Sequence, residues 1–281
     1  MAAALALNCV GPTDAAGRSF LWKASSPDGV LYLVGSVHLL STDYYPLNPS
    51  LDAAFTDSSM LVEEVDMSDM LGPDAQLRML TRGMLPGGQT LETVVSPATM
   101  ALVDKAVAGL GLPIGPLKQF KPWMLALTLV GLEWQRAGFD AELGLDKHFF
   151  DEAQRAGKPV QGLETVDYQI GRFDELSMSD QDHLLAESLK DSELADVKTL
   201  ADAWKAGDEP TVEHIVLDDL KTEPTLYQRL LVERNRNWLP KLEALFHRPG
   251  HALVVVGAAH LVGPDGLLAM LKAKGYVVEQ L

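Results

Sequence analysis

The sequence predicts an α/β protein with a central, mixed but largely parallel sheet, flanking helices and a large helical insertion. Short apolar runs of strand length gather towards both ends of the chain, and longer helical patterns fill the middle. No Pro, Gly and Ser stretch is long enough to separate domains. We therefore expect a single domain over residues 19–281 with a mostly helical segment over 96–250, preceded by a tail or the remnant of a signal peptide over 1–18.

Two strands are expected near the start of the domain, over residues 20–24 and 30–34. The residues between them, Ser25-Ser26-Pro27-Asp28-Gly29, have turn chemistry, so the pair is predicted to form a hairpin. The later run of one Leu and three Val is continuous rather than alternating, which suits a strand buried on both faces of a parallel sheet. In chain order, the further strands are expected over 60–65, 158–163, 253–256 and 276–279.

The middle of the chain carries the start and stop signals of helices. Ser96 before Pro97 is typical of an N-cap followed by proline at the first helical position, and Gly157 ends an amphipathic stretch. The expected helices cover residues 97–108, 122–136, 140–156, 180–190, 193–206 and 223–247.

Composition excludes several classes of function. With 23 basic and 39 acidic residues the net charge is −16, which disfavours nucleic acid and anionic lipid surfaces as partners. The single cysteine, Cys9, allows neither a disulfide within the chain nor a thiolate zinc cluster, so a metal would have to bind mainly His, Asp, Glu and water. The apolar stretch 123–132 is too short to cross a bilayer, and we expect no transmembrane segment.

A strand followed by Gly-x-x-His occurs twice. Residues 31–39 and 253–261 each contain four apolar residues, a glycine, two small or β-branched residues, a histidine and a leucine. Open α/β sheets bind ligands beyond the carboxyl ends of their strands, so His38 and His260 are expected to meet in one crevice there. The alternative is that both are polar loop residues packed at the edge of the sheet.

Two carboxylates follow comparable strands. Glu64 comes at the end of the run 60–65, and Glu164 directly follows 158–163. Two imidazoles and a carboxylate are a standard ligand set for a catalytic divalent metal, and a second carboxylate can accept a proton from its water. Either glutamate could instead be a solvated strand end or a helix cap, and we favour that interpretation for the neighbouring Glu63.

Other polar residues and motifs are weaker indications of a functional site. Arg234 could stabilise an oxyanion or pair with a carboxylate on the surface. Asp146 and His148 are two positions apart, so they do not share a helical face. His-Glu-x-x-His, Gly-x-Ser-x-Gly, the phosphate-binding loop and Cys-x-x-Cys are all absent from the sequence, and no nucleophile elbow supports a serine hydrolase at Ser36.

As an ordered set, these motifs resemble the TraB/GumN/Tiki family, and the bacterial GumN-type members in particular. The resemblance runs from about residue 20 to the C-terminus. Its motifs are Leu21-Trp22-Lys23, Gly-Ser-Val-His at 35–38, Tyr45-Pro46-Leu47, Glu-Val-Asp at 64–66, Gly-Leu-Asp at 144–146, Gly-Lys-Pro-Val at 157–160, Gly-Leu-Glu-Thr at 162–165, Gln169, Glu-Arg-Asn at 233–235 and Gly-Ala-Ala-His at 257–260. The resemblance implies a scaffold related to erythromycin-esterase-like and ChaN-like proteins.

The function that the resemblance implies is a metal-dependent hydrolase, and we expect a peptidase. His38, Glu64 and His260 would bind a divalent ion, with manganese, cobalt and zinc all compatible. Glu164 would act as base or outer ligand, and Arg234 would stabilise developing negative charge. A peptide or small molecule is the expected substrate, and the periplasm or another extracytoplasmic compartment the expected location, with the cytoplasm as the alternative. The competing functions are a non-catalytic protein that sequesters a peptide or other ligand, and an accessory role in polysaccharide production.

Overall fold

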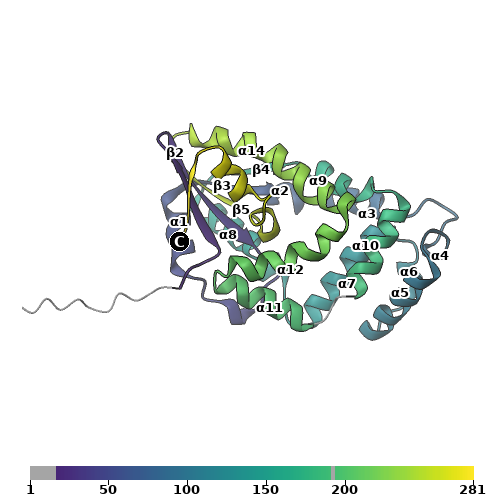
Figure 1. Ribbon diagram of the computed structural model, residues 1–281. Helices are drawn as coiled ribbons and strands as arrows, with labels where there is room; N and C mark the ends of the chain where they lie inside the picture. Colours follow the sequence, from purple (N-terminus) through teal and green to yellow (C-terminus); the bar gives the residue numbers. More distant parts are fainter. Residues whose placement is uncertain (1–16, 191–193) are drawn as a thin grey trace, which may run out of the picture.

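The computed structural model describes residues 17–190 and 194–281, and all but the last two residues of the predicted tail lie outside these ranges. A six-stranded sheet occupies one end of the molecule (Figure 1) in the order β4-β3-β5-β2-β1-β6. This mixed sheet with its many helices confirms the predicted fold class. The strands are β1 Leu21–Ser26, β2 Gly29–Ser36, β3 Ser58–Val65, β4 Val160–Glu164, β5 His251–Gly257 and β6 Val277–Gln280.

The four adjacent strands β4, β3, β5 and β2 are parallel. The remaining strands, β1 beside β2 and β6 at the edge, are antiparallel to their neighbours. β1 and β2 form the expected hairpin, with Ser26 paired with Gly29 across the turn. β5 lies between β3 and β2, and its run Leu253–Val256 is fully buried, as a continuous apolar strand requires. The carboxyl ends of the four parallel strands therefore lie side by side at one edge of the sheet.

The helices cover both faces of the sheet and extend beyond it. They are α1 Pro49–Asp57, α2 Met67–Met70, α3 Pro73–Gly83, α4 Leu91–Val94, α5 Pro97–Leu110, α6 Ile114–Leu117, α7 Pro122–Arg136, α8 Leu145–Ala156, α9 Val166–Asp174, α10 Met178–Lys190, α11 Leu194–Lys205, α12 Glu209–Thr222, α13 Pro224–Tyr227, α14 Glu233–Phe246 and α15 Leu267–Ala273. Short 3-10 turns cover Thr42–Tyr44, Ala141–Leu143 and Ala258–His260, and a π-helical turn, Gln228–Val232, joins α13 to α14.

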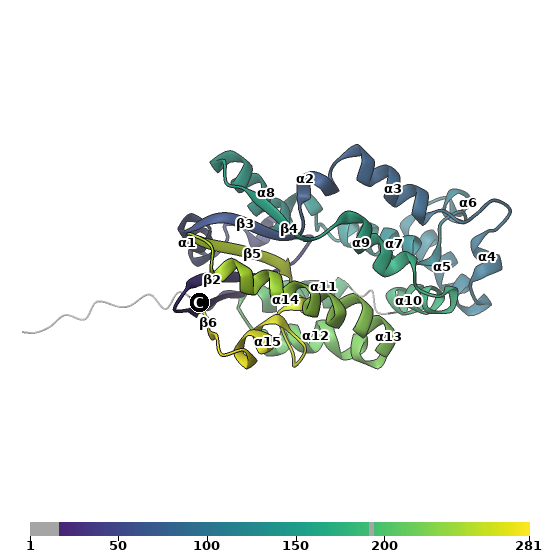
Figure 2. The ribbon, with the colours of Figure 1, turned by 90° about the horizontal axis from the view of Figure 1, so that it is seen from above.

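Two groups of helices have different surroundings. α1 and α8 pack on one side of β3 and β5, whereas α14 contacts β2 and β4 from the other side (Figure 2). α4 to α7 and α10 lie away from the sheet in both views and bury a smaller apolar cluster of their own, which includes Leu91, Val103, Leu129 and Leu185. The sheet and this second cluster thus form separate parts of the interior.

Some helices begin elsewhere than predicted or were not predicted. The helix expected over 140–156 begins at Leu145, because Gly144 precedes it in a tight approach to the His38 carbonyl oxygen, only 2.1 Å from where a Cβ would lie. α3 was not predicted, since Leu77 and Leu80 point to solvent and only Ala75 and Gly83 of this helix are buried. Its apolar residues therefore do not form the inward stripe on which a sequence-based assignment depends.

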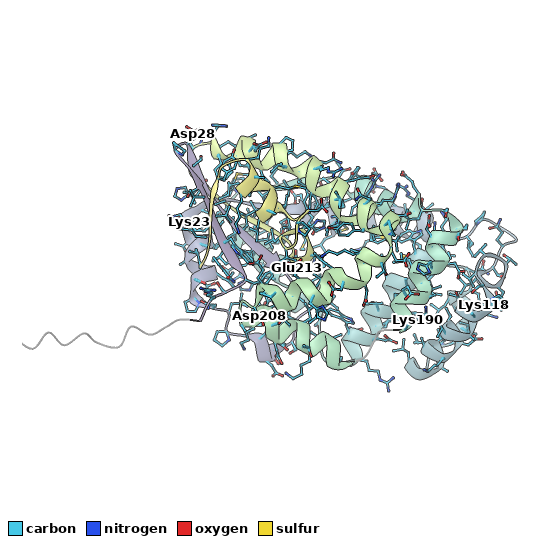
Figure 3. The ribbon with its side chains drawn as sticks, viewed as in Figure 1. Lys23, Asp28, Lys118, Lys190, Asp208 and Glu213 are labelled. Atoms are coloured by element: carbon cyan, nitrogen blue, oxygen red, sulfur yellow. The ribbon has the colours of Figure 1, made fainter. Side chains whose placement is uncertain are left out.

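Charged side chains cover the outside of the molecule. Figure 3 marks Asp28 at the tip of the β1–β2 hairpin and Lys118 near α6 at the opposite end. Among the described residues, no helix has both the length and the apolar character needed to cross a membrane.

We expect Gly35→Ala to destabilise the fold, because the new Cβ would lie 2.4 Å from the Phe20 ring and 3.1 Å from the backbone of Ala258. Overpacking of this kind costs about 1–3 kcal/mol. Gly131→Ala in α7 is the matched control, since no atom lies within 4 Å of its added Cβ, and it should stabilise the helix by up to about 1 kcal/mol. Urea unfolding measures both changes, and equal effects would contradict this account of Gly35.

Candidate active site

The sheet brings the four predicted residues to one edge. Glu164 ends β4, Glu64 lies near the end of β3, His260 follows β5 and His38 follows β2. Because these strands are adjacent and parallel, all four side chains come from the same, carboxyl-terminal edge. This is where open α/β sheets place their ligand sites.

Three of these side chains converge on Gly257. A Cβ at this glycine would lie 3.2 Å from Glu64 Oε1, 3.5 Å from His38 Nε2 and 3.7 Å from His260 Cδ2. The Gly257 N–H also donates to Glu64 Oε1 at 2.8 Å. The glycine of the second Gly-x-x-His motif therefore leaves open the space in which the carboxylate and both imidazoles meet.

His38 is held by a carboxylate from α8. Asp146 Oδ2 lies 2.8 Å from His38 Nδ1, and Asp146 Oδ1 accepts a hydrogen bond from Ser36 Oγ at 2.9 Å. The Asp146 charge raises the pKa of the His38 imidazole above its ordinary value, although the side chain is 59% exposed and solvent screens the interaction. With Nδ1 directed at Asp146, the ring turns Nε2 towards Gly257.

His260 is buried and anchored by an amide. Asn235 Nδ2 donates to the carbonyl oxygens of His260 and Asp265, so the acceptor facing the ring is Asn235 Oδ1, 2.7 Å from His260 Nδ1. Nδ1 therefore carries the proton, and the Nε2 lone pair is the acceptor of the ring. Burial, together with the nearby Arg234 charge, lowers the pKa of His260 to about 3, which keeps the ring neutral.

Arg234 lies among these groups. Its Nη1 is 2.9 Å from His260 Nε2, and its Nη2 donates to Glu64 Oε2 at 2.5 Å and to Glu164 Oε1 at 2.7 Å. Glu164 Oε2 accepts from Arg234 Nε and from Trp238 Nε1, so both oxygens of Glu164 already have donors. Glu164 thus fixes the guanidinium, while Trp238 stacks against it 4.7 Å from the ring centroid.

Glu64 accepts hydrogen bonds from three different residues. Beside Gly257 and Arg234, Gln169 Nε2 donates to its Oε2 at 3.0 Å. Burial by itself would raise the pKa of Glu64, but the Arg234 guanidinium, the His38 imidazole and the Gly257 N–H outweigh it and hold the pKa below its ordinary value. The side chain is therefore an anion at neutral pH.

The side chains of the site are chemically suited to a divalent ion, but they are not yet placed at ligand distances from one point. Two histidines whose Nδ1 atoms are fixed by Asp146 and Asn235, next to a carboxylate, match the way metal-binding histidines are usually oriented. Within the described residues, however, no three His, Cys, Asp or Glu side chains are already placed around one point at ligand distances. His260 Nε2 accepts a hydrogen bond from Arg234, so this bond would have to give way for His260 to become a ligand.

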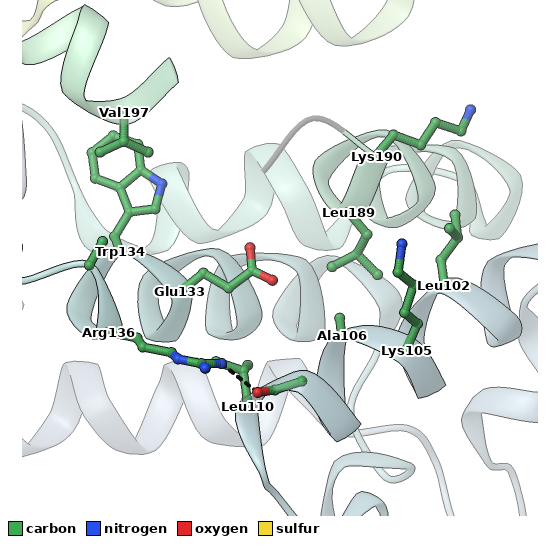
Figure 4. Close-up of a pocket in the computed structure, with 12 residues that line it drawn as sticks. Leu102, Lys105, Ala106, Leu110, Glu133, Trp134, Arg136, Leu189, Lys190 and Val197 are labelled. Carbon is green, nitrogen blue, oxygen red and sulfur yellow. Dashed lines mark hydrogen bonds between the residues drawn. The ribbon is translucent and has the colours of Figure 1, made fainter. Parts of the chain in front are cut away.

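A cavity of about 270 Å³ opens in front of His38 and Glu64. Its lining residues come mainly from β3, α2 and the start of α8, and they are His38, Glu63, Glu64, Val65, Met67, Met70, Leu71, Ala141, Glu142, Asp146, Lys147 and Gln169. A larger cavity of about 510 Å³ lies between α5, α7 and α10 (Figure 4). Its polar lining consists of Glu133, Lys105, Lys190 and Arg136 and contains no histidine, so it lacks the chemistry of the first cavity.

Of the two interpretations favoured for Glu63 on sequence, the structure supports the helix cap and not the solvated strand end. Its Oε2 accepts a hydrogen bond from the Met67 N–H at 3.2 Å at the start of α2, which fits a helix cap. The side chain is nonetheless buried, and its Oε1 has no hydrogen-bond partner. Burial, reinforced by the charge of Asp146, raises the pKa of Glu63 to about 8, so the carboxyl group is largely protonated at neutral pH. It is therefore not a solvated strand end.

Three polar residues of the site were not among the candidates from sequence, namely Asp146, Gln169 and Asn235. Asp146 was set aside because it shares no helical face with His148, but its partner is His38, 108 residues away. All three occur in the motifs that carried the family resemblance, which was the only available signal for them.

Comparison with known proteins assigns the chain to a family. Residues 20–280 match the sequence model of the TraB/PrgY/gumN family. The chain belongs to this family. The matched range includes both Gly-x-x-His motifs and every side chain around Gly257 described above. No solved structure matches the chain.

The relatives range from uncharacterised bacterial proteins to an animal protease. The chain is 28% identical to the uncharacterised protein YbaP of Escherichia coli, over 86% of this chain and 87% of that protein. It is 25% identical to metalloprotease TIKI2 of Danio rerio, over 93% of this chain but only 61% of the longer relative. An uncharacterised protein of Treponema pallidum is 21% identical, over 90% of this chain and 80% of that protein.

We predict that Asp146→Asn lowers the pKa of His38 in the metal-free protein by about one unit or more, because the negative charge that stabilises the imidazolium is removed. A histidine NMR titration in the presence of a chelator measures this. Asp151→Asn, on the same helix but paired with Lys147, is the control and should leave His38 unchanged. Identical titrations of wild type and Asp146→Asn would show that the pair contributes no electrostatic coupling.

Glu63→Gln should stabilise the metal-free protein near neutral pH. The pKa of Glu63 rises from 4.5 to about 8 on folding, so the unfolded chain loses this proton from about pH 4.5 upwards while the folded protein keeps it. Wild-type stability therefore falls between these pH values, and the amide abolishes that loss. We expect a gain of more than about 1 kcal/mol at pH 8 and little at pH 4.5, measured by urea unfolding with a chelator. A gain that does not depend on pH would contradict the assignment.

Proposed function

We propose that this protein is a divalent-metal-dependent hydrolase that acts on peptides, with His38, Glu64 and His260 as metal ligands. The observation that carries the proposal is the convergence of these three side chains on Gly257, beside a cavity open to substrate. The relative named as a metalloprotease adds support for both metal and peptide chemistry. Net charge adds little, since an acidic chain serves mainly to keep a protein soluble.

The surrounding residues support this chemistry. A divalent ion, when bound, lowers the pKa of its water towards neutrality and so supplies a nucleophile. Asp146 accepts a hydrogen bond from the Nδ1–H of His38, and Asn235 fixes the tautomer of His260, so each ring presents Nε2. Arg234 holds a permanent positive charge beside Glu64, where it can stabilise negative charge that develops on a substrate oxygen.

We assign Glu164 a positioning role. Its two oxygens accept from Arg234 and Trp238, so it holds the guanidinium in place instead of standing free to accept a proton. Trp238 also packs against His260, with ring centroids 4.4 Å apart. Arg234 is therefore positioned by Glu164 on one side and by the Trp238 ring on the other.

The direct test is turnover. The purified protein would be stripped with a chelator and assayed against a mixed peptide library, with manganese, cobalt or zinc returned separately. Hydrolysis that appears only after metal is returned, and that is lost in Glu64→Gln, is the expected result. Metal binding without cleavage of any peptide would instead support a protein that sequesters its ligand.

We expect the thermal shift caused by added manganese or zinc to disappear in His38→Ala, His260→Ala and Gly257→Ala. The first two remove a ligand, and the third puts a methyl group 3.2 Å from Glu64 Oε1 at the point of convergence. Gly257 has an ordinary φ of −49°, so alanine is compatible with its backbone and the protein should still fold. Wild type should show a ligand-dependent rise in melting temperature.

Gly131→Ala is the matched control, because it adds the same methyl group to α7 where nothing lies within 4 Å. It should retain the full metal-dependent shift. A wild-type shift in Gly257→Ala would mean that metal binds elsewhere on the protein, and a wild-type shift in either histidine variant would exclude that histidine as a ligand.

A further inference from the structure

The cavity in front of His38 and Glu64 is lined by side chains of two chemical kinds. One set carries the polar groups of the candidate site. The largest apolar side chains of the lining are Met67, Met70 and Leu71, from α2 and the residue that follows it. We call these three residues the α2 wall. In Figure 2, α2 lies at the end of β3, between α8 and α3, so this wall begins directly after the strand that supplies Glu64.

Exposed apolar side chains are concentrated in the part of the sequence that begins with this wall. Of the eight large hydrophobic residues that are exposed in the described part of the chain, Leu71, Leu77 and Leu80 fall within ten positions of sequence. Leu71, which lines the cavity, is 49% exposed. Clustered exposed apolar surface commonly marks a binding site. Two methionines in the same wall provide a flexible surface that adapts to side chains of different shape.

The α2 wall is fixed to the catalytic edge of the sheet. Asp66 caps α2 by accepting from the Ser68 N–H at 2.9 Å, and Glu63 accepts from the Met67 N–H. Glu63 and Glu64 are consecutive on β3, so one strand end positions both the apolar wall and the carboxylate of the candidate site. The distance between the wall and Glu64 is therefore set by the fold.

Charge and size narrow the choice of occupant. The cavity is lined by four carboxyl side chains, Glu63, Glu64, Glu142 and Asp146, and by one lysine, Lys147. That lysine already pairs with Asp151 at 2.5 Å. An apolar anion such as a fatty acid is thus disfavoured relative to an uncharged apolar group. A volume of about 270 Å³ lies just below the usual range for small-molecule pockets and suits one or two residues of an extended peptide.

We propose that the α2 wall binds a large apolar side chain of a peptide substrate and so sets the specificity of the site at the residue next to the reacting bond. This inference rests on the proposed function for the identity of the reaction. Binding of the apolar side chain can be measured without catalysis, because the α2 wall does not depend on a bound metal.

Methionine methyl NMR tests the binding directly. The protein would be labelled with ¹³C-methyl methionine, and the Met67 and Met70 signals assigned by substitution with leucine. The probes are acetyl-Gly-Gly-X-Gly-Gly-amide peptides with X as leucine, serine or aspartate, with octanoate as a further ligand. We expect the leucine peptide to shift the Met67 and Met70 signals and leave Met100 on α5 unchanged, and the serine and aspartate peptides to have at least tenfold weaker effects.

Matched variants locate the contact. Leu71→Glu should weaken the leucine peptide at least tenfold and Leu71→Ser less so, whereas Leu77→Glu, equally drastic but outside the cavity, should leave it unchanged. Equal effects of Leu71→Glu and Leu77→Glu, equal binding of the serine peptide, or tighter binding of octanoate than of the leucine peptide would each overturn the inference.

The outcome is separable from that of the proposed function. If the leucine peptide binds at the α2 wall but is never cleaved with any metal, the specificity inference holds and the hydrolase proposal fails. If leucine and serine peptides are cleaved with equal kcat/KM, the hydrolase proposal holds and the α2 wall is not its specificity surface.

Discussion

The buried guanidinium of Arg234 is the interaction on which the site depends. A charge that is 8% exposed is costly unless carboxylates compensate it, and here Glu64 and Glu164 both do so. These contacts join the ends of β3 and β4 to α14, and the bond to His260 adds the turn after β5. Removing any one of the carboxylates would leave the cation under-compensated, so the geometry of the site and local stability are coupled.

The same arginine also lies beside the proposed metal ligands, so its charge and position would affect metal binding. It occupies the Nε2 face of His260 while Glu64 Oε1 and His38 Nε2 remain directed at the space beside Gly257. A bound divalent ion would share this space with a permanent cation, and the Glu64 and Glu164 carboxylates would offset part of the resulting repulsion. A side chain at position 257 would enter the space where the three groups meet, with its Cβ 3.2 Å from Glu64 Oε1.

The sheet and the helices contribute different residues to the site. The ends of the parallel strands position His38, Glu64, Glu164 and His260 at one edge, and helices carry the side chains that orient them. Asp146 comes from α8, Gln169 from α9, and Arg234 with Asn235 from α14. The long helical segments between β3 and β5 therefore do more than cover the sheet, because they hold the orienting partners of both histidines.

The sequence by itself determined the hairpin, the buried parallel strand at Leu253–Val256 and the placement of His38, Glu64 and His260 after strands, because these follow from local periodicity and turn chemistry. Only the tertiary structure decided the partners. Asp146 meets His38 across 108 residues and Asn235 meets His260 across 25, and no local pattern encodes such distances. The burial of Glu63 was likewise decided by packing, because α2 and α8 close over a strand end that the sequence alone leaves open to solvent.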